Sequence, residues 1–200
     1  MSKVECVVFF CRRGLVSSPT TFYYFSNEKD NFSQKIKRVQ TLLQNWKIYL
    51  DTCCLSRFFN DQTQPRIRRE TEAVAEIISH FILMDWQWIS SEILVYEINQ
   101  NKNLRQRLYI KGLLGYAHHT VPAAPERSRA NRIASLGFQN RDALHIACAE
   151  SVNTDILLTT DDRMLKRAER FRTQLRVSVA NPYSWLMEVI QNEQSQSKTE

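Results

Sequence analysis

The chain has 200 residues, of which 43% are hydrophobic and 24% are charged, and this composition predicts one domain of ordinary size with or without tails. No run of about 18 apolar residues occurs, which excludes a membrane-spanning helix, and the apolar stretch 4–11 precedes a basic pair instead of following one, unlike a secretory signal. The formal net charge of +6 lies mostly in residues 1–46, which hold seven basic and three acidic residues, so it indicates little about the rest of the chain.

The two ends of the chain differ in pattern from its middle. Residues 1–45 contain many aromatic side chains but no sustained periodicity, so we interpret them as an N-terminal extension outside the fold. Within this extension, Ser33 to Gln44 could form a short basic helix. Residues 191–200 are polar and are expected to form a tail. The predicted domain therefore spans residues 46–190.

Short apolar strands alternate with amphipathic helices along this predicted domain. We expect strands at 47–50, 86–89, 120–123, 155–159 and 175–179, and helices at 65–83, 90–101, 104–117, 126–136, 141–151, 164–171 and 182–190. Ser90 or Ser91 is a suitable N-cap for the second of these helices, and Asn140 for the fifth. The alternation predicts an α/β fold, a three-layer α/β/α sandwich with a mainly parallel central sheet of about five strands.

The helix expected at 65–83 has two distinct faces. Its apolar residues recur at helical spacing, namely Val74, Ile77, Ile78, Phe81 and Ile82. Its polar face is expected to consist of Arg66, Arg68, Arg69, Glu70, Glu72 and Glu76. The apolar face could pack on the sheet or supply an interface for a homodimer. Among other apolar positions, Trp86 and Trp88 alternate along a strand and are expected in the core.

Several carboxylates follow strands or lie on helices that adjoin them. Asp51 ends the first strand, and Asp161 and Asp162 follow the fourth. In a parallel α/β sheet, ligands bind beyond the carboxyl ends of the strands, which is where these residues are placed. Asp142 lies in the first turn of a helix, and Glu97 lies among apolar neighbours on the helix after the second strand, which favours it over the alternative Glu92.

Each of these acids has an ordinary explanation when it is taken alone. Asp51 suits a turn or an N-cap, Asp142 suits the first turn of its helix, and Asp161 or Asp162 suits a cap. Four acids that meet at one edge would repel one another unless they share a cation or a proton. Oxygen ligands of this kind suit Mg²⁺ or Mn²⁺.

The chain from Ile48 to about Met187 resembles a PIN domain, the family that includes the toxins of VapBC toxin–antitoxin pairs. The matching segments are 48–52 (IYLDT), Glu97, 142–147 (DALHIA) and 158–165 (LTTDDRML), in this order. The resemblance implies that Asp51, Glu97, Asp142 and Asp162 are the catalytic, metal-binding acids, with Asp161 as an alternative or additional ligand. It also implies supporting hydroxyls at Thr52 and Thr160. The chain departs from the family pattern at Cys53-Cys54 and in the length of segment 52–64.

This resemblance implies hydrolysis of RNA phosphodiesters by a Mg²⁺- or Mn²⁺-dependent endoribonuclease, with a toxin role, a small antitoxin partner and a homodimer as further implications. Two alternatives stay open: a PIN nuclease without an antitoxin, acting in RNA processing or on DNA, and a catalytically silent binding module. Basic residues suited to a nucleic-acid backbone lie near the acids, at Arg141, Arg163, Lys166 and Arg167. Further basic residues occur at Arg127, Arg129, Arg132, Arg170, Arg172 and Arg176.

The remaining reactive side chains suggest no separate chemistry. The five cysteines are irregularly spaced and include no CxxC pair, so we expect reduced thiols in a cytoplasmic protein and no zinc site. His145 lies one turn after Asp142 and is expected to be packed or hydrogen-bonded locally.

Overall fold

The structure is a computed structural model that describes residues 45–196, with side chains up to Gln191. The N-terminal extension, including the helix expected at Ser33 to Gln44, and residues 197–200 lie outside the described residues. The strands are β1 (Lys47–Leu50), β2 (Gln87–Ser91), β3 (His119–Val121), β4 (Ile156–Leu158) and β5 (Ser178–Ala180). The helices are α2 (Thr52–Ser56), the 3₁₀ turn η1 (Arg57–Phe59), α3 (Pro65–Ile82), α4 (Glu92–Gln100), α5 (Leu104–Leu114), α6 (Arg127–Ala134), α7 (Asn140–Ser151), α8 (Asp162–Arg170) and α9 (Pro182–Gln196).

The five strands form one parallel sheet in the order β3-β2-β1-β4-β5, which confirms the predicted α/β fold. Tyr49 of β1 is in register with Ile89 of β2 on one side and with Leu157 of β4 on the other. The chain therefore runs outward from β1 through β2 to β3 and then crosses back to place β4 on the other side of β1. The point where the direction reverses, between β1 and β4, is where a sheet of this kind opens a crevice for ligands.

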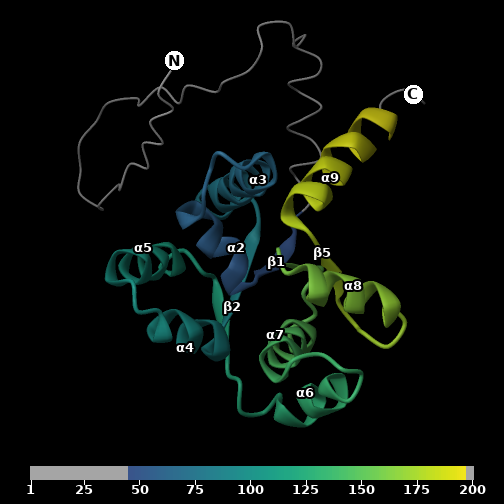
Figure 1. The fold of residues 1–200 in the computed structure, drawn as a ribbon. Coiled ribbons are helices and arrows are strands. Elements are labelled where there is room, and N and C mark those ends of the chain that lie inside the picture. The colour runs from purple at the N-terminus through teal and green to yellow at the C-terminus, as the bar shows by residue number, and fades with distance from the viewer. Residues whose placement is uncertain (1–44, 197–200) are drawn as a thin grey trace, which may run out of the picture. The chain divides into compact units, whose positions relative to one another are not determined.

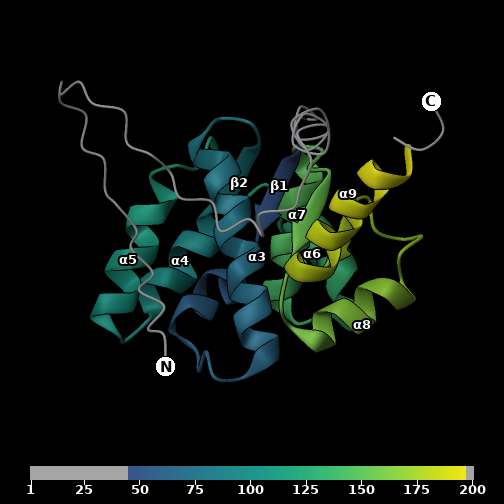
Figure 2. The ribbon, with the colours of Figure 1, turned by 90° about the horizontal axis from the view of Figure 1, so that it is seen from above.

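Helices cover both faces of the sheet. Figure 1 shows α3 and α9 on one side of the strands and α6 with α7 on the other, while α4 and α5 lie beyond β2 and α8 lies beside β5. Figure 2 views the same chain from the side of α3 and α9. The apolar face of α3 is buried at Val74, Ile77 and Phe81, so most of it packs within the chain, whereas Ile82 at the end of the helix is 44% exposed. Trp88 is fully buried and stacks on Phe81 with ring centroids 5.3 Å apart.

Every expected strand and helix is present, with most bounds within three residues of those expected, and four other differences stand out. The segment after β1 forms α2 and η1, for which no element was predicted, and α9 continues past residue 190 to Gln196. The N-cap of α7 is Gln139 instead of Asn140, while Ser91 caps α4 as expected by accepting from the Leu94 amide at 3.3 Å. The fourth difference concerns Glu70, which was assigned to the polar face of α3 but is only 2% exposed.

Among the described residues, no helix combines the length and the apolar composition that crossing a membrane requires. The side chains of Trp86 and Trp88 are both fully buried, as expected. Cys53, Cys54 and Cys148 are free thiols, which agrees with the expectation of reduced cysteines for this part of the chain.

Candidate metal centre

Asp51 lies directly beyond the carboxyl end of β1, beside the end of β4. Its backbone amide donates to the Leu158 carbonyl at 3.0 Å, which ties the two strand ends together. Although Asp51 occupies the N-cap position of α2, its carboxylate accepts from the Thr159 hydroxyl at 2.7 Å and the Cys53 thiol at 2.9 Å. The residue is 8% exposed. A cap does not explain this carboxylate, which is instead held at the reversal point of the sheet, where the ends of β1 and β4 meet.

Glu97 lies on α4, the helix that follows β2, and its side chain lies beside the end of β1. Its carboxylate accepts from the Thr52 hydroxyl at 2.6 Å and lies 3.1 Å from Nε2 of His145. Burial favours the protonated form of Glu97, but the hydrogen bond and positive charge of His145 outweigh it and lower the pKa of Glu97 below 4.5. Glu97 is therefore ionised. The hydroxyl that it accepts from belongs to Thr52, the residue that follows Asp51.

His145 is the residue of this centre that the sequence reasoning missed. It is 2% exposed, with Nδ1 2.6 Å from the Tyr49 hydroxyl and Nε2 3.8 Å from Oδ1 of Asp51. Its partners thus come from β1 and α4, not from its own helix as expected. One ligand atom from each of Asp51, Glu97 and His145 lies within 4.8 Å of the other two. The spacing of three from Asp142 places both side chains on one face of α7 and could have indicated this position.

The charge state of His145 follows from its acidic neighbours. Burial favours the neutral ring, but the hydrogen bond with Glu97 and the charges of Asp51 and Glu97 outweigh burial and raise the pKa of His145 above 6.5. An imidazolium donates from Nε2 to Glu97 and from Nδ1 to the Tyr49 hydroxyl, which in turn donates to Ser91. When protonated, this ring supplies positive charge to the cluster of acids.

Asp142, in the first turn of α7, faces the other acids. Burial, followed by the negative charges of Asp51 and Asp161, raises the pKa of Asp142 from 3.8 to about 6, and Glu97 adds to the shift. The shift thus reflects burial first and then the repulsion among carboxylates that no cation offsets. The donor set of several carboxylates with unrelieved repulsion fits a divalent ion of the Mg²⁺ or Mn²⁺ type.

The two adjacent acids after β4 point to different partners. Asp161 is the N-cap of α8, where one carboxylate oxygen accepts from the Arg163 and Met164 amides at 2.7 and 3.3 Å. Its charge acts on Asp142. Asp162 makes a bidentate ion pair with Arg66, at 2.6 and 2.8 Å, and its side chain is 56% exposed. The hydrogen bond from Arg66 lowers the pKa of Asp162. The structure therefore groups Asp161 with the acids of the crevice and places Asp162 against α3.

The hydroxyls also differ in part from the expected set. Thr52 lies where it was expected and donates to Glu97, but the hydroxyl beside Asp51 belongs to Thr159. The neighbouring Thr160 uses its backbone, since its amide donates to Cys53 and its carbonyl accepts from Arg57. The Thr160 hydroxyl is buried and has no hydrogen-bond partner within residues 45–191.

Two exposed guanidinium groups lie beside the acids. Arg141 is 3.9 Å from Glu97, and Arg163 is 3.7 Å from Asp161, with side chains 66% and 78% exposed. Lys166 and Arg167 are exposed on α8, and Arg167 donates to the Leu136 carbonyl. Arg129, in contrast, is committed to the fold, because it donates to both carboxylate oxygens of Glu150.

The raised pKa of Asp142 predicts a measurable change in stability. Because the folded pKa of about 6 exceeds the ordinary 3.8, protonation stabilises the folded state below pH 3.8, and that stability is lost as the pH rises through 6. Allowing for the partial exposure of the side chain, metal-free Asp142→Asn should be about 1 kcal/mol more stable than wild type at pH 7.5. Thermal unfolding should show a Tm about 2–4 °C higher at pH 7.5 and no difference at pH 3.5. A lower Tm for Asp142→Asn at pH 7.5 would contradict the shift.

Comparison with known families agrees with this arrangement. The family model of the PIN domain matches residues 48–170, which is more than half of the chain and includes every acid of the crevice. No curated protein matches the chain. The parallel sheet, the crevice at its reversal point and this match lead to one conclusion: the chain belongs to the PIN domain family.

Proposed function

We propose that the protein is a divalent-metal-dependent endoribonuclease that hydrolyses RNA phosphodiesters. PIN domains are generally metal-dependent nucleases, and the family match brings this general activity to the chain. The observation that carries the proposal is the grouping of Asp51 and Glu97 with His145 beyond β1 and β4, with one ligand atom of each within 4.8 Å of the others, and the effect of both acids' charges on Asp142. The acids come from three separate segments of the chain, and their negative charges act on one another. A catalytically silent module would gain nothing from keeping carboxylates that are partly buried and repel one another.

The acids proposed to hold Mg²⁺ or Mn²⁺ are Asp51, Glu97 and Asp142, with Asp161 as the fourth carboxylate in place of Asp162. A bound divalent ion of this kind lowers the pKa of water and offsets negative charge that develops on the phosphate. Thr159 and Thr52 orient the Asp51 and Glu97 carboxylates by donating hydrogen bonds to them. His145, held through Tyr49, contacts the same Glu97 oxygen as the Thr52 hydroxyl does. The protein's own contribution is thus a set of ligands already held in place.

The exposed cations beside the acids are suited to the substrate. Arg141 and Arg163 lie on opposite helices, α7 and α8, and each extends an exposed guanidinium next to an acid of the centre. Arginine binds phosphate oxygens with two parallel N–H groups, which favours a nucleic-acid backbone as the ligand at this position. Lys166 and Arg167 continue the basic surface along α8.

Cleavage of labelled total RNA with and without a chelator tests the proposal. We expect full-length protein to cut RNA with Mn²⁺ or Mg²⁺ present, to stop when EDTA is added, and to recover when excess Mn²⁺ follows. Single-stranded and duplex DNA of matched sequence are the comparison substrates, and end mapping of the products distinguishes internal cuts from shortening at the ends. RNA cleavage that continues in EDTA would reject the metal-dependent mechanism, and cleavage of DNA alone would reject RNA as the substrate.

The toxin role, a small antitoxin as partner, a homodimer and a cytoplasmic location remain part of the proposal. Their support is the resemblance of the matched segments to toxins of VapBC pairs. A small gene for a DNA-binding antitoxin directly upstream of this one would favour the toxin role over a nuclease that acts in RNA processing or on DNA.

A further inference from the structure

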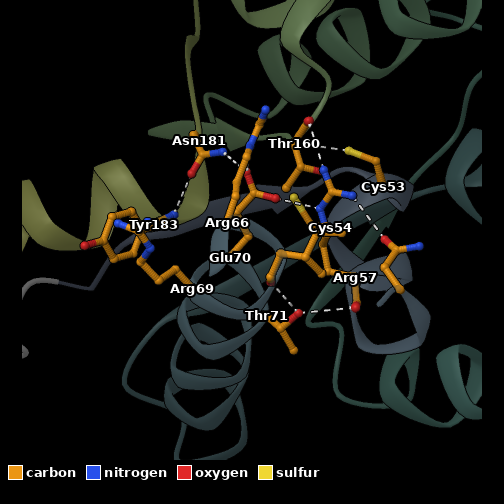
Figure 3. Close-up of polar contacts among 12 residues, drawn as sticks. Cys53, Cys54, Arg57, Arg66, Arg69, Glu70, Thr71, Thr160, Asn181 and Tyr183 are labelled. Atoms are coloured by element: carbon orange, nitrogen blue, oxygen red, sulfur yellow. Dashed lines mark hydrogen bonds and ion pairs between the residues drawn. The ribbon is translucent and has the colours of Figure 1, made fainter. Parts of the chain in front are cut away.

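A second buried carboxylate lies outside the metal centre, at Glu70 on α3. Figure 3 shows it between two arginines that come from different parts of the chain. Its two oxygens lie 2.6 Å from Nε of Arg57 and 2.8 Å from Nε of Arg66, and the second oxygen also accepts from the Asn181 side chain at 2.8 Å. Arg57 belongs to the turn that follows α2, and Asn181 directly follows β5. Glu70 therefore connects the segment that follows β1 with the segment that follows β5.

Both arginines continue from Glu70 to the segment after β4. Arg57 donates through its second terminal nitrogen to the Thr160 carbonyl at 3.4 Å, a contact also drawn in Figure 3. Arg66 donates through both terminal nitrogens to the Asp162 carboxylate. Thr160 and Asp162 are the two neighbours of Asp161 in the chain. The buried Glu70 carboxylate is thus linked, through two guanidinium groups, to both chain neighbours of Asp161, an acid of the proposed metal centre.

Stability alone does not account for this network. A carboxylate that is 2% exposed loses its hydration, and a buried ion pair is often no more stabilising than well-packed apolar residues of the same volume. Guanidinium groups, however, bind in fixed planar geometry, so a carboxylate between two of them defines their directions closely. The network is suited to fixing position, and the position it fixes is that of residues 160–162.

We propose that Glu70 is a positioning residue of the metal centre, which acts through Arg57 and Arg66 on Thr160 and Asp162 and so directs the Asp161 carboxylate toward Asp142. This inference rests on the proposed function, because it takes Asp161 to be a metal-binding acid. It also gives a role to the ion pair of Asp162, which aligns the first turn of α8 from outside the crevice. Asp161 itself needs this alignment because one of its oxygens is already used as the cap of α8.

Calorimetric titration of the full-length, metal-free protein with Mn²⁺ tests the proposal without reference to activity. Glu70→Gln keeps the shape of the side chain and removes the charge that aligns both arginines, and we expect Mn²⁺ to bind about tenfold more weakly. Glu72→Gln is the matched control, since Glu72 lies two residues further along α3 with an exposed side chain paired to Arg68. It should bind Mn²⁺ as wild type does. Circular dichroism and Tm establish that each variant is folded.

A second variant serves if Glu70→Gln does not fold. Arg66 is half-exposed, so Arg66→Lys should fold; it keeps the charge but loses the bidentate grip on Asp162, and it should also weaken Mn²⁺ binding. Arg68→Lys, on the same helix and also exposed, is its control and should leave binding unchanged.

A double-mutant cycle separates positioning from general destabilisation. If Glu70 acts through Asp161, then adding Glu70→Gln to Asp161→Asn should cause no further loss of Mn²⁺ affinity. A further tenfold loss in the double variant, or unchanged affinity in folded Glu70→Gln and Arg66→Lys, would overturn the proposal. The proposed function fails by a different result, namely wild-type protein that binds no Mn²⁺ and does not cut RNA.

Discussion

Asp51→Asn should reduce kcat/KM for RNA cleavage by roughly a hundredfold to a thousandfold. Asp51 lies at the reversal point of the sheet and is the acid that both the Thr159 hydroxyl and the Cys53 thiol orient. Asparagine has nearly the same shape and can keep the contact with Thr159, but it removes a negative charge and replaces one oxygen ligand with a nitrogen that carries hydrogens. The measurement is the initial rate of cleavage of an end-labelled RNA across a series of Mn²⁺ concentrations.

Asp61→Asn is the matched control for this substitution. Asp61 is exposed in the loop between η1 and α3, and its carboxylate accepts from Thr63 in a local turn. The same change from carboxylate to amide at this position should leave kcat/KM close to the wild-type value. Wild-type rates in folded Asp51→Asn protein would mean that the reaction, if any, takes place elsewhere on the chain.

A comparison of Asp161→Asn with Asp162→Asn should give the second largest effect. We expect Asp161→Asn to lower cleavage and Mn²⁺ affinity by about ten- to a hundredfold, because it removes a carboxylate whose charge acts on Asp142. Asp162→Asn removes an exposed ion pair with Arg66, and such pairs contribute at most about 1 kcal/mol, so its effect should be about fivefold or less.

The two variants are each other's control, since they differ by one position and carry the same chemical change. The reverse order, with Asp162→Asn inactive and Asp161→Asn active, would restore Asp162 as the fourth ligand. It would also mean that Asp162 leaves Arg66 when metal binds. Cleavage assays with matched Mn²⁺ titrations on both proteins distinguish these results.

The sequence allowed the fold to be predicted because apolar periodicity is a local property. Lys47–Leu50 and Pro65–Ile82 have the bounds expected to within one residue, since a buried strand and an amphipathic helix each show their spacing directly. Segment 52–59 gave no such signal, because five helical residues and one 3₁₀ turn are too short to show a period. Asp51 could be placed because the end of a parallel strand is a fixed point of the architecture.

The direction of adjacent side chains could not be predicted in this way. Asp161 and Asp162 contact different partners, since Asp161 has extended backbone geometry at the N-cap and Asp162 begins the helix. The contact between Asp162 and Arg66 joins α8 to α3, and a tertiary contact of this kind leaves no signal in local spacing. Motif spacing favoured Asp162 as the fourth ligand, and which of the two acids binds metal stays a prediction.

Glu70 shows a signal that was present and was not used. It precedes Val74 by four residues and Ile77 by seven, so it lies on the same face of α3 as the buried residues. Its charge led to the opposite assignment, since charged residues are rarely buried. A charged residue in register with an apolar face indicates a buried partner, and here the partners are Arg57 and Arg66.

The order of the strands has a consequence for how the protein is made. β4 is the immediate neighbour of β1 in the sheet, yet their paired residues Tyr49 and Leu157 are separated by most of the domain's length in the chain. A polypeptide still emerging from the ribosome carries Asp51 long before it carries Thr159 and Asp161. Translation products that end before β4 consequently lack one of the two central strands and also Asp161, so the proposed metal centre can form only after most of the domain has been translated.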